Sequence, residues 1–256
     1  NVVGALAPRI DEAILAGVRR KPLADLSVYD CWLRALEGLR RGTLEAHAEA
    51  RIYLERALEA DPDFARAYSG MSLTYFNEWS CHAWDRWEDT ATEAQRWAEE
   101  AVRRDETDHV THAILGRILM YRRNFARAEH HADRAEALNP NDADMLAQGA
   151  VMHSALGDAA RGIGESRVAL SLNLLHDDWY FLYAAYPQLM ARQYQPALDY
   201  ASRAPDAGTD VRAFLAVALA RLGRRDESAR MRERFLLTFQ RNITHGRTPE
   251  PDEPVR

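Results

Sequence analysis

A small residue recurs along this chain at nearly constant intervals, each time inside a stretch that is patterned like a helix. The recurring positions are Ala50, Ala94, Ala128, Gly162, Ala197 and Ser228, and the intervals between them are 44, 34, 34, 35 and 31 residues. A second series of small residues precedes the first: Gly38, Ser72, Gly116, Ala150, Ala185 and Ala216. Small side chains let two helix backbones approach closely, so each pair of positions predicts an antiparallel helical hairpin.

The stretch from His109 to Pro140 shows one such hairpin most clearly. Apolar and small residues recur at three- and four-residue steps on both sides of Arg122-Arg123-Asn124, and Asn139-Pro140 ends the pattern. A hairpin of this size cannot bury its own apolar face, so it needs similar hairpins as neighbours. The sequence therefore predicts an array of stacked hairpins that grows by addition, without a single central core.

A helix–turn–helix unit repeated about every 34 residues resembles the tetratricopeptide-repeat family. The resemblance covers about residues 28–242 and implies an all-α fold, a right-handed superhelical solenoid of about six repeats. We expect the repeats at residues 28–62, 65–106, 109–142, 143–176, 178–208 and 209–242. Residues 1–22 are patterned as an amphipathic helix, which would cap the open end of the first repeat or pair with a second copy, and residues 243–256 form a proline-rich tail.

Repeat two contains about ten residues more than its neighbours. The extra residues fall in a stretch that includes Trp79, Trp84 and Trp87. They could form an exposed edge that binds a partner, because tryptophan is enriched at binding hot spots. Alternatively, both helices of this repeat are longer and the indoles pack against one another, which is the commoner situation in helical packing and the one we favour.

The bulk composition excludes several classes of partner. A net charge of −6 gives no general attraction to nucleic acid, and no apolar run reaches membrane-spanning length. Cys31 and Cys81 are too few for a disulfide framework, so we expect a reduced, cytoplasmic compartment. Because the chain begins with Asn1 and not with methionine, we expect it to be part of a longer protein.

Four histidines of repeat three are the one group that suggests metal chemistry. His109 and His112 lie one helical turn apart, and His130 and His131 belong to the partner helix. Together they could bind Zn²⁺ or Ni²⁺, but adjacent side chains on a helix point about 100° apart and no HExxH motif is present. We therefore favour structural roles and keep metal binding as the last alternative. No catalytic set or phosphate loop is present, so we expect no enzyme, cofactor or metal site.

The family resemblance implies a groove lined by the first helix of each repeat, in which a peptide or a partner helix binds. The residues at those positions are Arg66, Leu73, Phe76, Asn77, Arg117, Met120, Tyr121, Asp144, Val151, Trp179, Leu182 and Tyr186. This mixture of aromatic, aliphatic and isolated charged residues suits an apolar or extended segment. It differs from the Lys/Asn clamp of chaperone-binding members, since only Asn77 is of that kind. Alternatively, several of these side chains pack on their neighbours or are covered by residues 1–20.

A narrower resemblance concerns residues 9–75. The linker Arg20-Lys21-Pro22 followed by Val28-Tyr29-Asp30 and Leu33-Arg34 is similar to the C-terminal region of bacterial signalling proteins. In those proteins a class III adenylate/guanylate cyclase domain or a winged-helix domain precedes a TolB-like region and the repeats. The resemblance implies a scaffolding or regulatory module, with any cyclase activity located upstream. A homodimerisation element is the alternative, with the candidate residues Leu6, Ile10, Ile14, Trp79, Trp84 and Trp87.

Overall fold

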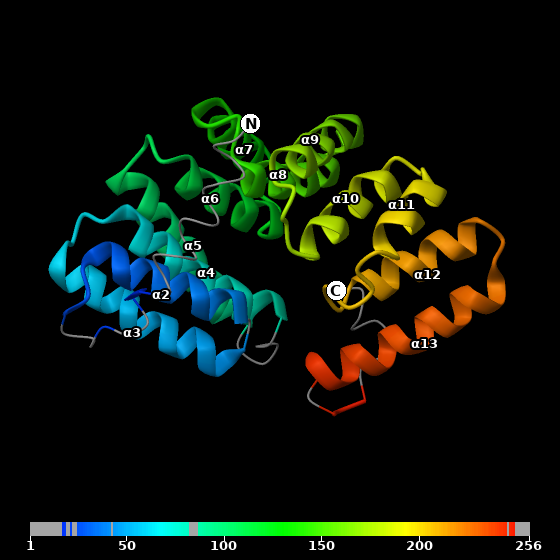
Figure 1. The fold of residues 1–256 in the computed structure, drawn as a ribbon, viewed down its shortest axis with the longest axis horizontal. Helices are drawn as coiled ribbons and strands as arrows, with labels where there is room; N and C mark the ends of the chain where they lie inside the picture. The colour runs from blue at the N-terminus through cyan, green and yellow to red at the C-terminus, as the bar shows by residue number, and fades with distance from the viewer. Residues whose placement is uncertain are drawn as a thin grey trace. The chain divides into compact units, whose positions relative to one another are not determined.

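The computed structural model describes residues 17–18, 21, 25–41, 43–81, 87–244 and 246–248. Within these residues the chain forms twelve α-helices and no strand, so the predicted all-α fold is confirmed (Figure 1). The chain divides into two compact units, Asn1–Pro140 and Asn141–Arg256. The right-handed superhelical path stays a prediction.

Among the described residues, each unit contains three pairs of consecutive helices, and one pair lies within the bounds of each expected repeat. The helices of unit one are α2 (Val28–Arg41), α3 (Leu44–Ala60), α4 (Ala65–Cys81), α5 (Trp87–Arg104), α6 (His109–Tyr121) and α7 (Phe125–Leu138). Those of unit two are α8 (Ala143–Ala155), α9 (Ala159–Leu172), α10 (Trp179–Met190), α11 (Tyr194–Ala201), α12 (Val211–Arg221) and α13 (Arg225–Asn242). In each pair the two helices pack directly against one another.

The recurring small residues lie where the paired helices cross, as the sequence predicts. A Cβ atom on Gly38 would lie 2.8 Å from the Ala46 carbonyl oxygen, and one on Gly116 would lie 3.2 Å from the Ala128 carbonyl oxygen. Ala50, Ala94 and Ala128 are completely buried. The two backbones are therefore close enough to exclude larger side chains, which is the physical reason for the periodic pattern.

Local signals set the ends of several helices. Asp158 caps α9, because its carboxylate accepts a hydrogen bond from the Arg161 amide. The preceding Gly157 has a φ of 108°, a conformation that side chains rarely adopt, so it closes the turn between α8 and α9. Thr43 caps α3 in the same way through the Ala46 amide. These polar residues start the second helices of repeats one and four where their apolar patterns begin.

The extra residues of repeat two lengthen its helices. Helices α4 and α5 have 17 and 18 residues, whereas α6 and α7 have 13 and 14. The rings of Trp79 and Trp87 lie 6.3 Å apart between centroids, so the indoles of the two helices meet. Longer helices with packed indoles, the interpretation favoured from the sequence, are therefore what the described residues show. Trp84 lies outside the described residues.

Little of the predicted N-terminal helix can be followed. Val18 is 2% exposed and packs with Leu33 and Leu26 beside α2. Leu6, Ile10 and Ile14, the candidate dimer residues of this segment, lie outside the described residues, as do residues 249–256 of the tail. Among the helices that the structure describes, none is long and apolar enough to cross a membrane.

Candidate functional site

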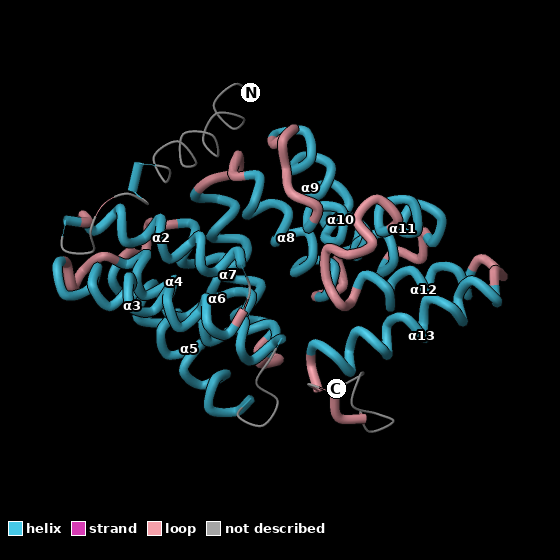
Figure 2. Tube along the Cα trace, turned by 60° about the horizontal axis from the view of Figure 1, so that its bottom comes forward, coloured by secondary structure: helices cyan, strands magenta, loops and turns pink. Residues whose placement is uncertain are grey.

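The first helices of consecutive repeats lie next to one another inside each unit. In unit one α2 contacts α4 and α4 contacts α6, and in unit two α10 contacts both α8 and α12 (Figure 2). The groove residues expected from the sequence lie on these helices. We call the line where α4 and α6 meet the α4–α6 seam. Its members are Arg66, Leu73, Phe76, Arg117, Met120 and Tyr121.

The middle of the seam is built around Phe76, which is only 5% exposed. Its ring meets the ring of Tyr121 edge-on at 5.1 Å, and the Arg117 guanidinium lies 4.6 Å from its centroid. Leu73 and Met120 are half-buried and pack on the same core. Phe76 therefore belongs to the core and packs beneath the exposed side chains of the seam. Tyr121 is 51% exposed and forms part of the solvent-accessible surface.

At one end the α4–α6 seam adjoins an aromatic group made by Tyr121 with Trp79 of α4 and Trp87 of α5. Trp79 is 7% exposed and lies between two exposed rings, those of Tyr121 at 5.8 Å and Trp87 at 6.3 Å. Trp87 is 52% exposed, and beside it an ion pair joins Arg122 Nη1 to Glu88 Oε1 at 2.9 Å. Two exposed rings over a buried indole form a rigid apolar surface, because the rings are held by their contacts with Trp79.

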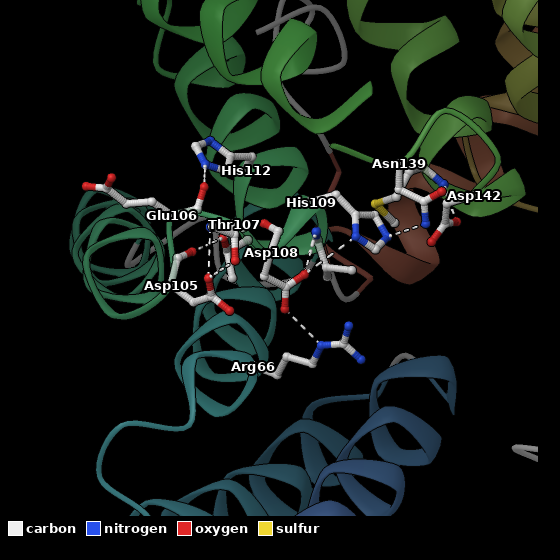
Figure 3. A network of polar contacts seen from close by, with 12 residues as sticks. Arg66, Asp105, Glu106, Thr107, Asp108, His109, His112, Asn139 and Asp142 are labelled. Carbon is white, nitrogen blue, oxygen red and sulfur yellow. Dashed lines mark hydrogen bonds and ion pairs between the residues drawn. The ribbon is translucent and has the colours of Figure 1, made fainter. Parts of the chain in front are cut away.

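The other end of the seam is polar, and Asp108 organises it. Its Oδ1 accepts the Val110 amide at 2.9 Å and so caps α6, while its Oδ2 accepts Arg66 Nε at 2.8 Å (Figure 3). In the loop just before it, the Thr107 hydroxyl and amide donate to Asp105 and lower the pKa of that carboxyl. Asp108 is not among the expected site residues, because in the sequence it is indistinguishable from a simple capping residue.

Asn77 does not lie on the seam. Its amide nitrogen is 3.5 Å from His47 Nε2, so it is directed toward α3 and away from α6. The expected groove position is therefore occupied by a residue that packs against the preceding repeat. The sequence already offers no lysine for a Lys/Asn clamp. Because Asn77 is directed toward α3, the asparagine that such a clamp would need is also missing from the seam.

In unit two the expected aromatic groove residues pack on neighbouring rings. Trp179 meets Tyr183 at 4.9 Å, and Tyr186 meets Phe214 at 5.6 Å, where burial raises the pKa of the Tyr186 hydroxyl. Val151, Leu182 and these aromatic residues are all half-buried. Packing of the groove side chains on their neighbours is the alternative to an open groove that the sequence left. The α4–α6 seam of unit one is therefore more exposed than the corresponding surface of unit two.

The four histidines of repeat three do not converge. The Nδ1 atoms of His112 and His131 are 2.9 Å apart, and His112 Nε2 is 3.1 Å from the Glu106 carbonyl oxygen. His109 lies beside Asn139, and His130 is exposed. Two nitrogens at 2.9 Å share a hydrogen, whereas two ligands of one Zn²⁺ at about 2.05 Å would lie about 3.3 Å apart. The described residues contain no group of three or more metal-binding side chains.

The pKa values of this histidine pair follow from its burial. Burial lowers the pKa of His131 to about 4, and the neighbouring His112 adds to the effect. Burial also lowers the pKa of His112. Both imidazoles are therefore neutral at pH 7. Since the Glu106 carbonyl can only accept, His112 carries its hydrogen on Nε2, and His131 donates from Nδ1 to His112 Nδ1.

Comparison with known proteins identifies the fold of the chain. No protein-family model matches the chain. Over 110 residues the chain is 29% identical to the Rhizobium meliloti (strain 1021) protein named "Putative adenylate cyclase 3", a match that covers 41% of the chain and 18% of that protein. The matched part of the chain thus spans less than a fifth of the length of this relative.

Among the solved structures that resemble the chain are the following three. A chain of the APC/C hetero-tetramer Cut9–Hcn1 has a TM-score of 0.64 and 17% identity, covering 90% of this chain and 43% of that one. PilW, a type IV pilus biogenesis factor, has a TM-score of 0.56 and 16% identity, covering 84% and 93%. A thermophilic tetratricopeptide-repeat protein of Thermus thermophilus has a TM-score of 0.53 and 19% identity, covering 73% and 99%. The chain has the fold of tetratricopeptide-repeat proteins.

Proposed function

We propose that this chain is a non-catalytic protein-interaction module that binds a segment of another protein along the α4–α6 seam. The observation that carries the proposal is the aromatic end, where Tyr121 and Trp87 are each about half exposed and are both fixed by the buried Trp79. Rigid aromatic side chains bind with little loss of conformational entropy and dominate binding hot spots. The half-buried Leu73, Met120 and Arg117 extend this surface along the seam.

The comparisons support a binding role without naming the partner. One structural neighbour is a chain of the Cut9–Hcn1 hetero-tetramer. The likeness to a protein named as an adenylate cyclase supports a place for the module in a larger bacterial cytoplasmic signalling protein, with the catalytic part outside this chain. In this proposal the repeats recruit a regulator or assemble the signalling complex.

The test replaces the two exposed rings. The full chain is immobilised and proteins of the source bacterium are captured and quantified by mass spectrometry, first with the unchanged chain and then with Trp87→Ala/Tyr121→Ala. Because loss of one hot-spot residue costs about 2 kcal/mol, or about thirtyfold in affinity, we expect recovery of the partner to fall at least about tenfold. The captured partner is then purified and its affinity for both chains measured directly.

Phe125→Ala is the matched control. Phe125 is 52% exposed, like Trp87, and likewise starts the second helix of its hairpin, but it lies outside the group of rings formed by Trp79, Tyr121 and Trp87. Recovery of the partner should be unchanged in this variant. The proposal fails when every captured protein is lost equally in both variants, or when none depends on Trp87 and Tyr121.

A further inference from the structure

The last helix of unit two, α13, has an outer face that nothing in the described part of the chain covers. Only Phe239 is buried among the 18 residues of α13. By contrast, α5 and α7 in unit one bury five and four residues. Leu236 is 41% exposed and Leu237 is 61% exposed. Helix α13 packs against α12 on its inner side (Figure 1). The exposure of Leu236 and Leu237 shows that this packing does not bury either leucine.

This face is basic. From Arg230 to Arg241 the helix carries four arginines and one glutamate, in a chain with a net charge of −6. Arg234 and Arg241 lie one turn before and one turn after Leu237, so they flank it on the helix surface. Arg232 and Arg234 are exposed, and neither guanidinium makes an ion pair or a hydrogen bond with any residue that the structure describes. The positive charge is therefore not neutralised locally.

We infer that the outer face of α13 binds an acidic amphipathic helix of a partner protein. In a repeat array the second helix of each hairpin contacts the next hairpin, as α3 contacts α4 and α11 contacts α12. A helix of a partner protein would contact α13 as the next hairpin contacts α3 and α11 within the array. Its leucines would pack on Leu236 and Leu237, and its carboxylates would pair with Arg232 and Arg234.

The charge of this face favours a helix of another protein over a second copy of α13 as the binding partner. Two copies of this face would bring eight arginines and two glutamates together, and like charges in a packed interface disfavour association. A membrane is the other ligand that a basic, leucine-bearing helix can bind, but only two leucines protrude and the charged Glu233 lies one turn before both of them. So small an apolar area gives weak insertion, whereas it suffices for the centre of a helix pair.

The test uses the full chain and a synthetic helix. The probe is a capped peptide of about 18 residues with leucines at i, i+3, i+4 and i+7 and glutamates beside them, compared with the same peptide carrying lysines. Fluorescence anisotropy should show at least about tenfold tighter binding of the acidic peptide. Its affinity should fall with rising salt, because exposed ion pairs are screened. Arg232→Glu/Arg234→Glu should reverse the preference, so that the lysine peptide binds more tightly.

The leucines are tested with a matched control. Leu236→Ser/Leu237→Ser should weaken binding of the acidic peptide at least about tenfold. Leu174→Ser/Leu175→Ser, which removes two leucines that are 76% and 60% exposed in the loop after α9, should leave binding unchanged. Circular dichroism confirms that both variants stay helical. These variants do not touch the α4–α6 seam, so the outcome is independent of the proposed function.

Three results would overturn the inference. The first is equal binding of the acidic and the lysine peptide, or acidic-peptide binding that persists in Leu236→Ser/Leu237→Ser. The second is binding of phosphatidylserine/phosphatidylcholine vesicles through Leu237 without binding of the peptide, which would make a membrane the ligand. The third is a dimer in sedimentation that dissociates in Leu236→Ser/Leu237→Ser, which would make a second copy the partner.

Discussion

The buried histidine pair of repeat three makes the stability of unit one depend on pH in a defined window. His131 is 9% exposed and its pKa is lowered to about 4 from 6.5, because burial and the nearby His112 disfavour the charged form. Above pH 6.5 both the folded and the unfolded chain hold this imidazole neutral. Between pH 6.5 and about 4 the unfolded chain binds a proton that the folded chain does not. Stability therefore falls as the pH falls through this window.

The magnitude follows from the size of the shift. One pKa unit corresponds to about 1.36 kcal/mol, so a shift from 6.5 to about 4 lowers the free energy of unfolding by about 3 kcal/mol at the lower end of the window. Below that pH the contribution of His131 is constant. The lowered pKa of His112 acts in the same direction. Two protonated rings both donate from Nδ1 and cannot keep these atoms 2.9 Å apart, so the hydrogen bond between His112 and His131 is lost.

Tryptophan fluorescence can follow unit one alone. Five of the six tryptophans precede residue 140, and Trp179 is the exception. Urea unfolding is therefore measured in a Trp179→Phe background at several pH values between about 7 and 4. His131→Gln keeps a donor for His112 but does not titrate, so the difference in pH dependence between the two chains isolates His131. We expect the difference to grow to about 3 kcal/mol near pH 4.

His130→Gln is the control, because His130 is the next residue along α7 but is exposed. Its pH dependence should match that of the unchanged chain. The reasoning is refuted when His131→Gln loses stability with falling pH as steeply as the unchanged chain does, since carboxylate titration is common to both.

Two further predictions concern unit two. A Cβ on Gly162 would lie 2.5 Å from the Ala150 carbonyl oxygen, whereas one on Gly164 meets nothing within 4 Å. Gly162→Ala should therefore lower the free energy of unfolding by about 1–3 kcal/mol, while Gly164→Ala on the same helix should raise it by up to about 1 kcal/mol, as urea midpoints followed by circular dichroism would show. The buried Tyr180 hydroxyl donates to Asp144 and accepts from the Asn173 amide. Tyr180→Phe should cost about 1–3 kcal/mol in the same assay, and an unchanged midpoint would contradict that role.

The hairpins could be predicted from the sequence because their signal is periodic. A small residue at a helix crossing is required in every repeat, so Gly38, Gly116 and Gly162 mark the same physical constraint at different points of the chain. The burial of Phe76 and Trp79 could not be predicted in this way. It depends on the length of α4, which with 17 residues is longer than the first helix of every other described repeat.

The polar end of the seam could not be predicted for a different reason. Arg66 and Asp108 are 42 residues apart in the sequence, and each has a sufficient local explanation as a solvated charge or a helix cap. The pairing of His112 with His131 is similar, since the sequence places four imidazoles in one hairpin without indicating which two face each other. Side-chain pairs of this kind depend on the rotation of each helix about its axis, which periodicity fixes only to within about a residue.

The repeat architecture separates residues that build the fold from those that can select a partner. The residue that follows the small residue of the first helix is Leu73, Arg117, Val151, Tyr186 and Val217 in repeats two to six. The small residue before it is fixed by the helix crossing, so the backbone presents these five side chains in equivalent positions. None of the five is fully buried. Because packing does not dictate their chemistry, an aliphatic, a cationic and an aromatic side chain occur at the same place, and we expect exchanges between them to change partner affinity with little effect on stability.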